Sequence, residues 1–304
     1  MDLLGVFAQL ISLFLMMLVG FIAARAGIVT PEFRKQLSTF TLHVASPCII
    51  LSSALQSTIP ASGMLTVLLV AVLFFLVMIV LGQLIARLLR SSPSEHGLNV
   101  LMLVFTNVGF MGMPVVDSIY GSDGVAMVAM FILMFNLTCF SYGVALISGG
   151  MKFSLRTLAN PCIFAAIGAL LFALTGLHLP AVIESTLTSL GCMNTPLAML
   201  IIGASLCHSD IRAALTNPRL YKISLVRMLV MPLLILGLVM LLPISPMLAG
   251  VTVIMAAMPI AGNCAMLSDM YTPEDMTASQ AVIVSTLMSA ATLPVICALI
   301  SMVF

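Results

Sequence analysis

The sequence predicts an all-α membrane protein in which ten transmembrane helices form two inverted repeats of five helices. Three observations carry this prediction: the scarcity of charged residues, the placement of the basic residues, and an internal similarity between the two halves of the chain. Residues 1–150 are predicted to form the first repeat and residues 151–304 the second.

The composition places the chain in lipid. Of its 304 residues, 62% are hydrophobic and 7% are charged, whereas soluble domains carry roughly 25% charged residues. Eleven basic and ten acidic side chains cannot cover the outside of such a chain in water, so the outside must face lipid. A net charge of +1 also provides no basic surface for nucleic acid, and no nucleic-acid partner is expected.

Stretches without Asp, Glu, Lys or Arg locate the spans. There are eight, and because one span needs about 20 residues, the two longest, 36–86 and 228–268, must each hold two. Both contain a turn signal, at residues 57–63 and 242–246. The predicted spans are 4–24, 35–56, 64–88, 97–118, 124–147, 160–177, 186–207, 221–242, 247–268 and 277–303.

The basic residues predict the orientation, because short cytoplasmic loops retain Lys and Arg. Ten of the eleven lie in odd-numbered loops, and the remaining one, Arg227, lies inside span eight, from where it is expected to snorkel to the same side. The first span carries Asp2 and lacks a cleavage site, so it is expected to be retained. The chain is therefore predicted to cross the cell membrane repeatedly, with both termini outside.

Prolines mark the internal repeat. Pro47 in span two and Pro196 in span seven lie 149 residues apart, and Pro114 in span four and Pro259 in span nine lie 145 apart. Because the first half has an odd number of spans, five, the second half enters the membrane from the opposite side, as in the inverted repeats of many transporters. Any single proline could be a simple kink, but two related pairs predict helix breaks at Pro47 and Pro196 and helices that restart at Pro114 and Pro259.

Such restarting helices predict an anion site near mid-membrane. Each presents a partly positive N-terminus with unpaired N–H groups. With no Lys or Arg expected at that depth, the anion would be held by these helix ends and by the amides of Asn107 and Asn263. Gly109 and Gly112 precede the break in span four and complete the predicted site.

Other intramembrane polar residues have two interpretations each. Asp117, one turn beyond Pro114, is a candidate for proton or cation coupling or a residue at the mouth of span four. His43 is a second coupling candidate or a hydrogen-bonded packing residue. No metal or cofactor is expected, since the seven cysteines are scattered through the spans without metal-ligand spacing.

Residues 107–114 (NVGFMGMP) resemble the fourth-helix motif of the auxin efflux carrier (AEC) family, which includes the plant PIN transporters and many bacterial permeases. Later segments resemble further signatures of the family in the same order. They are residues 160–161, 196–206, 257–259, 285–287 and 292–294.

The resemblance implies a ten-helix fold like that of PIN and bile acid symporter relatives. It implies a scaffold of helices 1, 2, 6 and 7 that also dimerises, and a transport domain of helices 3–5 and 8–10. Broken helices 4 and 9 would cross near the substrate, with Asn107, Pro114 and Pro259 matching the family's site and Asn263 placed by neighbourhood. The loop at residues 148–152 is short, so the loop regulation of long plant PINs does not carry over.

The expected function is therefore a carrier that moves an organic anion, an auxin-like or small carboxylic acid, by an elevator-like or rocking exchange. The alternatives are an anion channel and an ion-coupled symporter of another amphipathic solute. An enzyme is not expected, because the chain lacks G-x-S-x-G, H-E-x-x-H and paired histidines.

Overall fold

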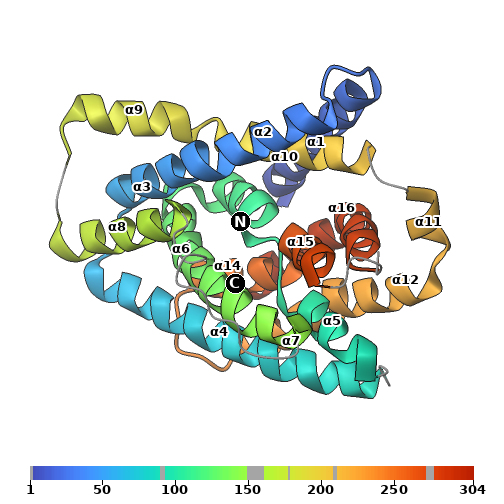
Figure 1. Ribbon diagram of the computed structural model, residues 1–304. Helices are drawn as coiled ribbons and strands as arrows, with labels where there is room; N and C mark the ends of the chain where they lie inside the picture. The colour runs from blue at the N-terminus through green and yellow to red at the C-terminus, as the bar shows by residue number, and fades with distance from the viewer. Residues whose placement is uncertain (1–2, 90–92, 149–160, 177–178, 208–210, 272–276) are drawn as a thin grey trace. The chain divides into compact units, whose positions relative to one another are not determined.

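The computed structural model describes residues 3–89, 93–148, 161–176, 179–207, 211–271 and 277–304, and most of these residues are helical (Figure 1). In this part of the chain the extended pairing is limited to an isolated bridge between Thr106 and Ile260. The predicted all-helical class is confirmed.

The chain divides into two compact units, and each unit combines segments from both halves of the sequence. The first comprises residues 1–70, 109–133 and 159–209, and the second comprises residues 71–108, 134–158 and 210–304. The long helices α4 (Ala61–Leu88) and α6 (Met113–Thr138) pass from one unit into the other. The boundaries of the two compact units therefore differ from the boundary at residue 150 between the two predicted repeats.

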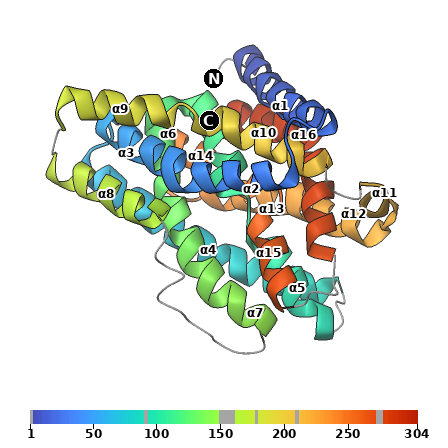
Figure 2. The same ribbon diagram turned by 45° about the horizontal axis from the view of Figure 1, so that its top comes forward.

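In the first unit, α1 runs along α10, and α3 packs against α8 and α9 (Figures 1 and 2). A threonine side chain, Thr30, accepts a hydrogen bond from the backbone of Phe33 and caps the start of α2. The helices that lie wholly in this unit are α1 (Leu3–Arg25), α2 (Pro31–Phe40), α3 (Ser46–Gln56), α8 (Pro161–Thr175), α9 (Ala181–Gly191) and α10 (Asn194–Cys207).

In the second unit, α16 packs against α11, α12, α14 and α15, and α13 packs against α14. Ser245 caps the start of α14 by accepting a hydrogen bond from the backbone of Leu248. The helices of this unit are α5 (Pro93–Val104), α7 (Val144–Ser148), α11 (Ile211–Thr216), α12 (Pro218–Leu225), α13 (Met231–Val239), α14 (Pro246–Ala257), α15 (Gly262–Tyr271) and α16 (Thr277–Val303).

Several helical segments are long and apolar enough to cross a membrane. In the described residues there are six: Pro31–Gln56, Ala61–Leu88, Val108–Ser148, Ala181–Cys207, Pro218–Val239 and Thr277–Val303. Three shorter apolar helices accompany them, at Ile11–Arg25, Pro161–Phe172 and Pro246–Ala257. The chain is thus a multi-pass membrane protein, while the count of ten spans stays a prediction.

Three prolines follow a π-helical turn. The turns are Thr41–Ala45, Val108–Gly112 and Val226–Val230, and the prolines are Pro47, Pro114 and Pro232. A proline removes the N–H that would reach the carbonyl four residues earlier, and its ring clashes with that carbonyl. The wider turn makes room for the ring, so the helix continues. The break expected at Pro47 is therefore a continuous helix with one widened turn.

The predicted connection between spans four and five is reduced to one glycine inside α6. Gly121 adopts φ +61° and ψ −150°, a conformation that side chains other than glycine rarely adopt. The helix axis is interrupted there, and Asp123 just beyond accepts hydrogen bonds from the backbone and hydroxyl of Thr58 at 2.7 and 2.8 Å. Asp123 therefore lies near the start of the second part of α6, and its carboxylate bonds to the loop that contains Thr58.

Two glycines let α1 and α10 approach backbone to backbone. A Cβ atom added to Gly203 would lie 1.8 Å from the carbonyl oxygen of Met17, and one added to Gly20 would lie 2.3 Å from the carbonyl oxygen of Leu200. Backbone cannot withdraw as a flexible side chain can, so even a methyl group would force the two helices apart.

We therefore expect Gly203→Ala to lower the free energy of unfolding by about 1–3 kcal/mol, the usual penalty for overpacking. Gly237→Ala in α13 is the matched control, because a Cβ there meets no atom within 4 Å. Thermal unfolding of both variants in detergent checks the prediction. Equal midpoints for the two variants would contradict the close helix contact.

Candidate functional site

Two non-helical segments of the second unit pair with one another. Residues 105–107 follow α5, and residues 258–261 follow α14. The backbone N–H of Asn107 donates to the carbonyl of Pro259 at 2.8 Å, and the N–H of Ala261 donates to the carbonyl of Phe105 at 3.0 Å. Each segment thus satisfies backbone groups that the other leaves open, which lipid could not do.

The paired segments lie deep along their helices. α5 and α14 each contain 12 residues before their interruption, and at 1.5 Å per residue each helix rises roughly 18 Å. A hydrocarbon core is about 30 Å thick. The paired segments therefore fall near mid-depth in a spanning orientation of these helices.

A third helix completes the pairing. The N–H of Ile260 donates to Ser285 Oγ on α16 at 3.1 Å, and that hydroxyl donates in turn to the carbonyl of Val282. The thiol of Cys264, in the first turn of α15, approaches the carbonyls of Leu101 and Phe105 at 3.6 and 3.9 Å. The interrupted region is therefore built from α5, α14, α15 and α16 together.

One hydroxyl at the pairing has no partner. Thr106 is fully buried, and its Oγ1 makes no hydrogen bond in the described part of the chain. Leaving a buried hydroxyl unpaired costs about 1–3 kcal/mol. Such orphaned groups are a feature of binding sites, where water or a ligand supplies the missing bond.

Arg227 corrects two expectations about charge. The guanidinium is not drawn to the membrane surface: the residue is 0% exposed and its Nη1 donates to the carbonyl of Ala256 at 2.7 Å. It lies nine residues after the start of α12, roughly 14 Å along the span, so a cation is present at a depth where none was expected. The last carbonyls of α14 carry partial negative charge, and this attracts the guanidinium inward.

The predicted site residues are only partly brought together. Asn107 and Pro259 lie in the paired segments, and Asn263 lies in the first turn of α15. Gly109, Gly112 and Pro114 belong to the first unit, in the π-helical turn and the start of α6.

The predicted restart points of both helices are wrong. The fourth-span helix resumes at Val108, so Pro114 sits inside continuous helix, whereas the ninth-span helix resumes at Gly262, so Pro259 sits inside the interruption. The two prolines thus occupy different positions relative to their breaks. The bridge between Thr106 and Ile260 shows which residues actually face each other.

A second polar cluster lies in the first unit and was not predicted from sequence. The hydroxyl of Ser46 donates to Asn194 Oδ1 at 2.6 Å, and Asn194 Nδ2 donates to the sulfur of Met113 at 3.4 Å. Ser46 directly precedes Pro47 and Asn194 lies two residues before Pro196, so this cluster joins the first repeat-related proline pair. Pro196 itself is the third residue of α10, just after the turn at residues 192–193.

The two coupling candidates, Asp117 and His43, each make a hydrogen bond to an uncharged group. Asp117 accepts a long hydrogen bond of 3.4 Å from the hydroxyl of Thr195. His43 is exposed, and its Nδ1 donates to the carbonyl of Thr39 in the same helix at 2.9 Å. Among the residues that the structure describes, no group of three or more His, Cys, Asp or Glu side chains could hold a metal ion.

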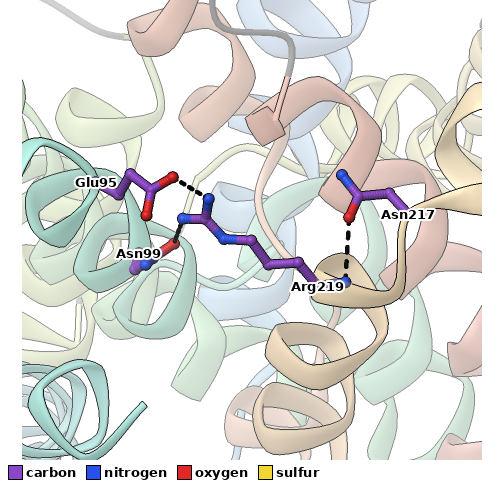
Figure 3. Close-up of polar contacts among 4 residues, drawn as sticks. All are labelled: Glu95, Asn99, Asn217 and Arg219. Carbon is purple, nitrogen blue, oxygen red and sulfur yellow. Dashed lines mark hydrogen bonds and ion pairs between the residues drawn. The ribbon is translucent and has the colours of Figure 1, made fainter. Parts of the chain in front are cut away.

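Outside this region, Figure 3 shows a polar contact between α5 and α12. Arg219 pairs with Glu95 and donates to Asn99 Oδ1 at 3.2 Å, while Asn217 caps α12 by accepting from the backbone of Arg219. The side chains of Arg219 and Glu95 are 36% and 38% exposed, so their attraction is screened and is worth at most about 1 kcal/mol. The pair orients α12 more than it stabilises it.

Paired helix interruptions in a multi-pass membrane protein are typical of many solute transporters. The chain matches the family model described as membrane transport protein over residues 5–155 and 150–297. It therefore belongs to this family, that of the auxin efflux carriers, and the predicted resemblance is confirmed.

Two archaeal relatives are similar over much of the chain. An uncharacterized transporter of Methanothermobacter thermautotrophicus is 27% identical over 293 residues, which is 93% of this chain and 95% of the relative. An uncharacterized transporter of Methanocaldococcus jannaschii is 25% identical over 205 residues, which is 63% of this chain and 66% of the relative. The chain is accordingly a membrane transport protein.

The third-helix contact at the paired segments can be tested. Ser285→Ala leaves the buried N–H of Ile260 without an acceptor and should lower the free energy of unfolding by about 1–3 kcal/mol. Ser301→Ala is the control on the same helix, because its hydroxyl bonds only to the carbonyl of Ala298. Thermal unfolding in detergent measures both, and equal losses would argue against the contact between Ile260 and Ser285.

Proposed function

We propose that this protein is a secondary carrier of organic anions, with carboxylates as the substrate class, and that it works by alternating access around the paired segments 105–107 and 258–261. The observation that carries the proposal is the pairing itself. It creates helix ends at mid-depth, where a substrate could exchange between the two sides of the membrane. Membership of a transport family supplies the general activity.

The charge of the site favours an anion. The start of α15 directs partial positive charge toward the interruption. The buried Arg227 lies against the last turn of α14 and adds a full positive charge. With the amides of Asn107 and Asn263 as further donors, these groups would complement a carboxylate and repel a cation.

The division into two units supports a scaffold and a moving part. The predicted spans one, two, six and seven lie wholly in the first unit, together with parts of spans three to five. The paired segments lie wholly in the second. We propose that the first unit provides the scaffold and the dimer contact and that the second carries the substrate.

Contacts between loops support the predicted topology. In the first unit, Thr58 bonds to Asp123, which joins the connections that follow spans two and four. In the second unit, Arg219 pairs with Glu95, which joins the connections that follow spans seven and three. Each contact links two even-numbered or two odd-numbered loops. This parity is required if all odd-numbered loops share the cytoplasmic face and both termini lie outside.

Asp117 and His43 are the candidates for coupling to a proton or cation. Asp117 is the stronger one, since it accepts a long hydrogen bond from a hydroxyl and its carboxylate can change its charge. His43 bonds locally within its own helix. Uptake measured in vesicles with imposed proton or sodium gradients, with Asp117→Asn and His43→Gln compared, separates coupled from uncoupled transport.

The proposed carrier activity is tested in proteoliposomes with labelled malate and indole-3-acetate. The parent protein should accumulate at least one of them saturably and show counterflow, which a channel does not. Asn107→Ala should raise the KM roughly tenfold or more, the effect of losing one hydrogen bond to a charged group. Gln56→Ala, which removes an exposed amide bonded to Thr188, is the control. Unsaturable flux or an unchanged Asn107→Ala variant would reject the proposed site.

The topology is tested by cysteine labelling in intact cells. In a background with the exposed Cys192 replaced by alanine, Leu241→Cys should react with an external impermeant maleimide, because it lies in the turn after α13, at the end of span eight that borders an even-numbered loop. Leu215→Cys, in an odd-numbered loop, should react only after permeabilisation. Both residues are exposed, at 81% and 43%. The reverse pattern would invert the assignment of both termini.

A further inference from the structure

The guanidinium of Arg227 is only partly used. It has five N–H donors, and the structure assigns one contact, from Nη1 to the carbonyl of Ala256. Nε and Nη2 have no hydrogen-bond partner among the described residues, although the residue is 0% exposed. A buried charge without partners is strongly unfavourable, so the unused atoms need an explanation.

The unused atoms form one edge of the guanidinium. Nε and Nη2 point their N–H bonds in parallel from the same side of the planar group, and this edge matches the two oxygens of a carboxylate. Nη1, on the opposite side, is the atom occupied by Ala256. The backbone contact therefore fixes the group while leaving free the edge that binds carboxylates with two hydrogen bonds.

Arg227 lies next to the paired segments within the second unit. Ala256, its backbone partner, comes two residues before the interruption at residues 258–261. Cys264, whose thiol approaches the carbonyl of Phe105, lies in the first turn of α15, directly after the interruption. Two further buried hydroxyls of this unit have no partner within the described ranges: Thr106 in the paired segments, and Ser224, three residues before Arg227 on its own helix.

A capping role alone does not account for this arrangement. A basic side chain near the last carbonyls of α14 is favourable, and Nη1 alone meets that need. Capping does not explain why a planar, permanently charged group is buried with a complete bidentate edge unpaired. A bound anion explains the charge, the free edge and the neighbouring unpaired hydroxyls together.

We propose that Arg227 is the counter-charge of the transported anion and that its Nε–Nη2 edge binds the substrate's carboxylate, with Thr106 and Ser224 as supporting hydroxyls. This rests on the proposed function, because it names the group that recognises the substrate of the same site. Arg227 is the one charged residue that is fully buried in the described part of the chain, and its single charge matches one carboxylate. The carrier should therefore require an acid and reject the amide of the same molecule.

The test compares acids with their amides in proteoliposomes. Uptake of labelled malate and indole-3-acetate is competed with unlabelled acid and with malamide or indole-3-acetamide. In the parent protein, the acid should compete at least tenfold better than its amide. Arg227→Gln should raise the KM for the acid roughly 10- to 100-fold, as expected for losing a buried charged hydrogen-bond partner, and should abolish the preference for the acid. Arg227→Lys, which keeps the charge without the planar edge, should be intermediate.

Arg34→Gln is the matched control. Arg34 also donates one bond to another helix, from Nη1 to Ser205 Oγ at 2.7 Å, and its Nε also has no partner among the described residues, but it lies in α2 of the first unit, outside the paired segments. Its replacement should leave the preference for acid over amide unchanged. If it erased that preference as Arg227→Gln does, the effect would be general and the assignment to Arg227 would be wrong.

The outcomes separate this inference from the proposed function. If the parent protein takes up neither acid, the carrier proposal fails for these substrates and the inference fails with it. If the parent is active but folded Arg227→Gln keeps its KM and its preference, the inference fails and the carrier proposal stands. Should both variants of Arg227 fail to fold, dipolar-recoupling NMR on the parent protein, with ¹⁵N-arginine and a ¹³C-carboxylate probe, must detect the contact, and its absence would reject the proposal.

Discussion

The exchange of backbone hydrogen bonds between residues 105–107 and 258–261 is the constraint on which the second unit depends. A helix that stops inside a bilayer exposes carbonyl and N–H groups that lipid cannot satisfy. Here each interruption supplies hydrogen-bond partners to the other: the N–H of Asn107 donates to the carbonyl of Pro259, and the N–H of Ala261 donates to that of Phe105. Neither interruption is tolerable without the other, so the arrangement ties α5, α14 and α15 into one element.

The same constraint explains the chemistry that gathers there. Helix ends supply partial charges at a depth where water is absent, and electrostatic interactions are stronger in such surroundings. Ser285 accepts a backbone hydrogen bond, from the N–H of Ile260, that the two segments do not supply to each other, whereas the side chains of Thr106 and Arg227 have polar atoms without a partner among the described residues. Backbone groups of both segments are thus held by hydrogen bonds while selected side chains are left available, and such side chains could bind a polar solute without loosening the fold.

Much of the architecture could be predicted because it follows from composition and local pattern. Charge-free stretches located the apolar helices, and the motif at residues 107–114 indicated the family. The exact position of each break could not be read from the prolines, because a π-helical turn lets Pro114 remain in a helix while Pro259 lies outside one. The burial of Arg227 was missed because it depends on the end of α14, which is distant in sequence and adjacent only in the fold. Contacts such as Ser46 with Asn194 likewise depend on tertiary packing that no local pattern encodes.

The π-helical turns before Pro47, Pro114 and Pro232 affect more than the prolines they accommodate. Each widened turn holds one residue more than an α-helical turn, and one residue corresponds to about 100° of rotation around the axis. Everything beyond the turn is therefore out of phase with everything before it. A helix of this kind presents one face to its neighbours before the turn and a different face after it. A pattern of apolar residues with a helical period is therefore interrupted at the turn. Arg227 lies inside such a turn, so the spacing of apolar residues along the helix does not predict which way its side chain points. Its direction follows instead from the contact with the end of α14.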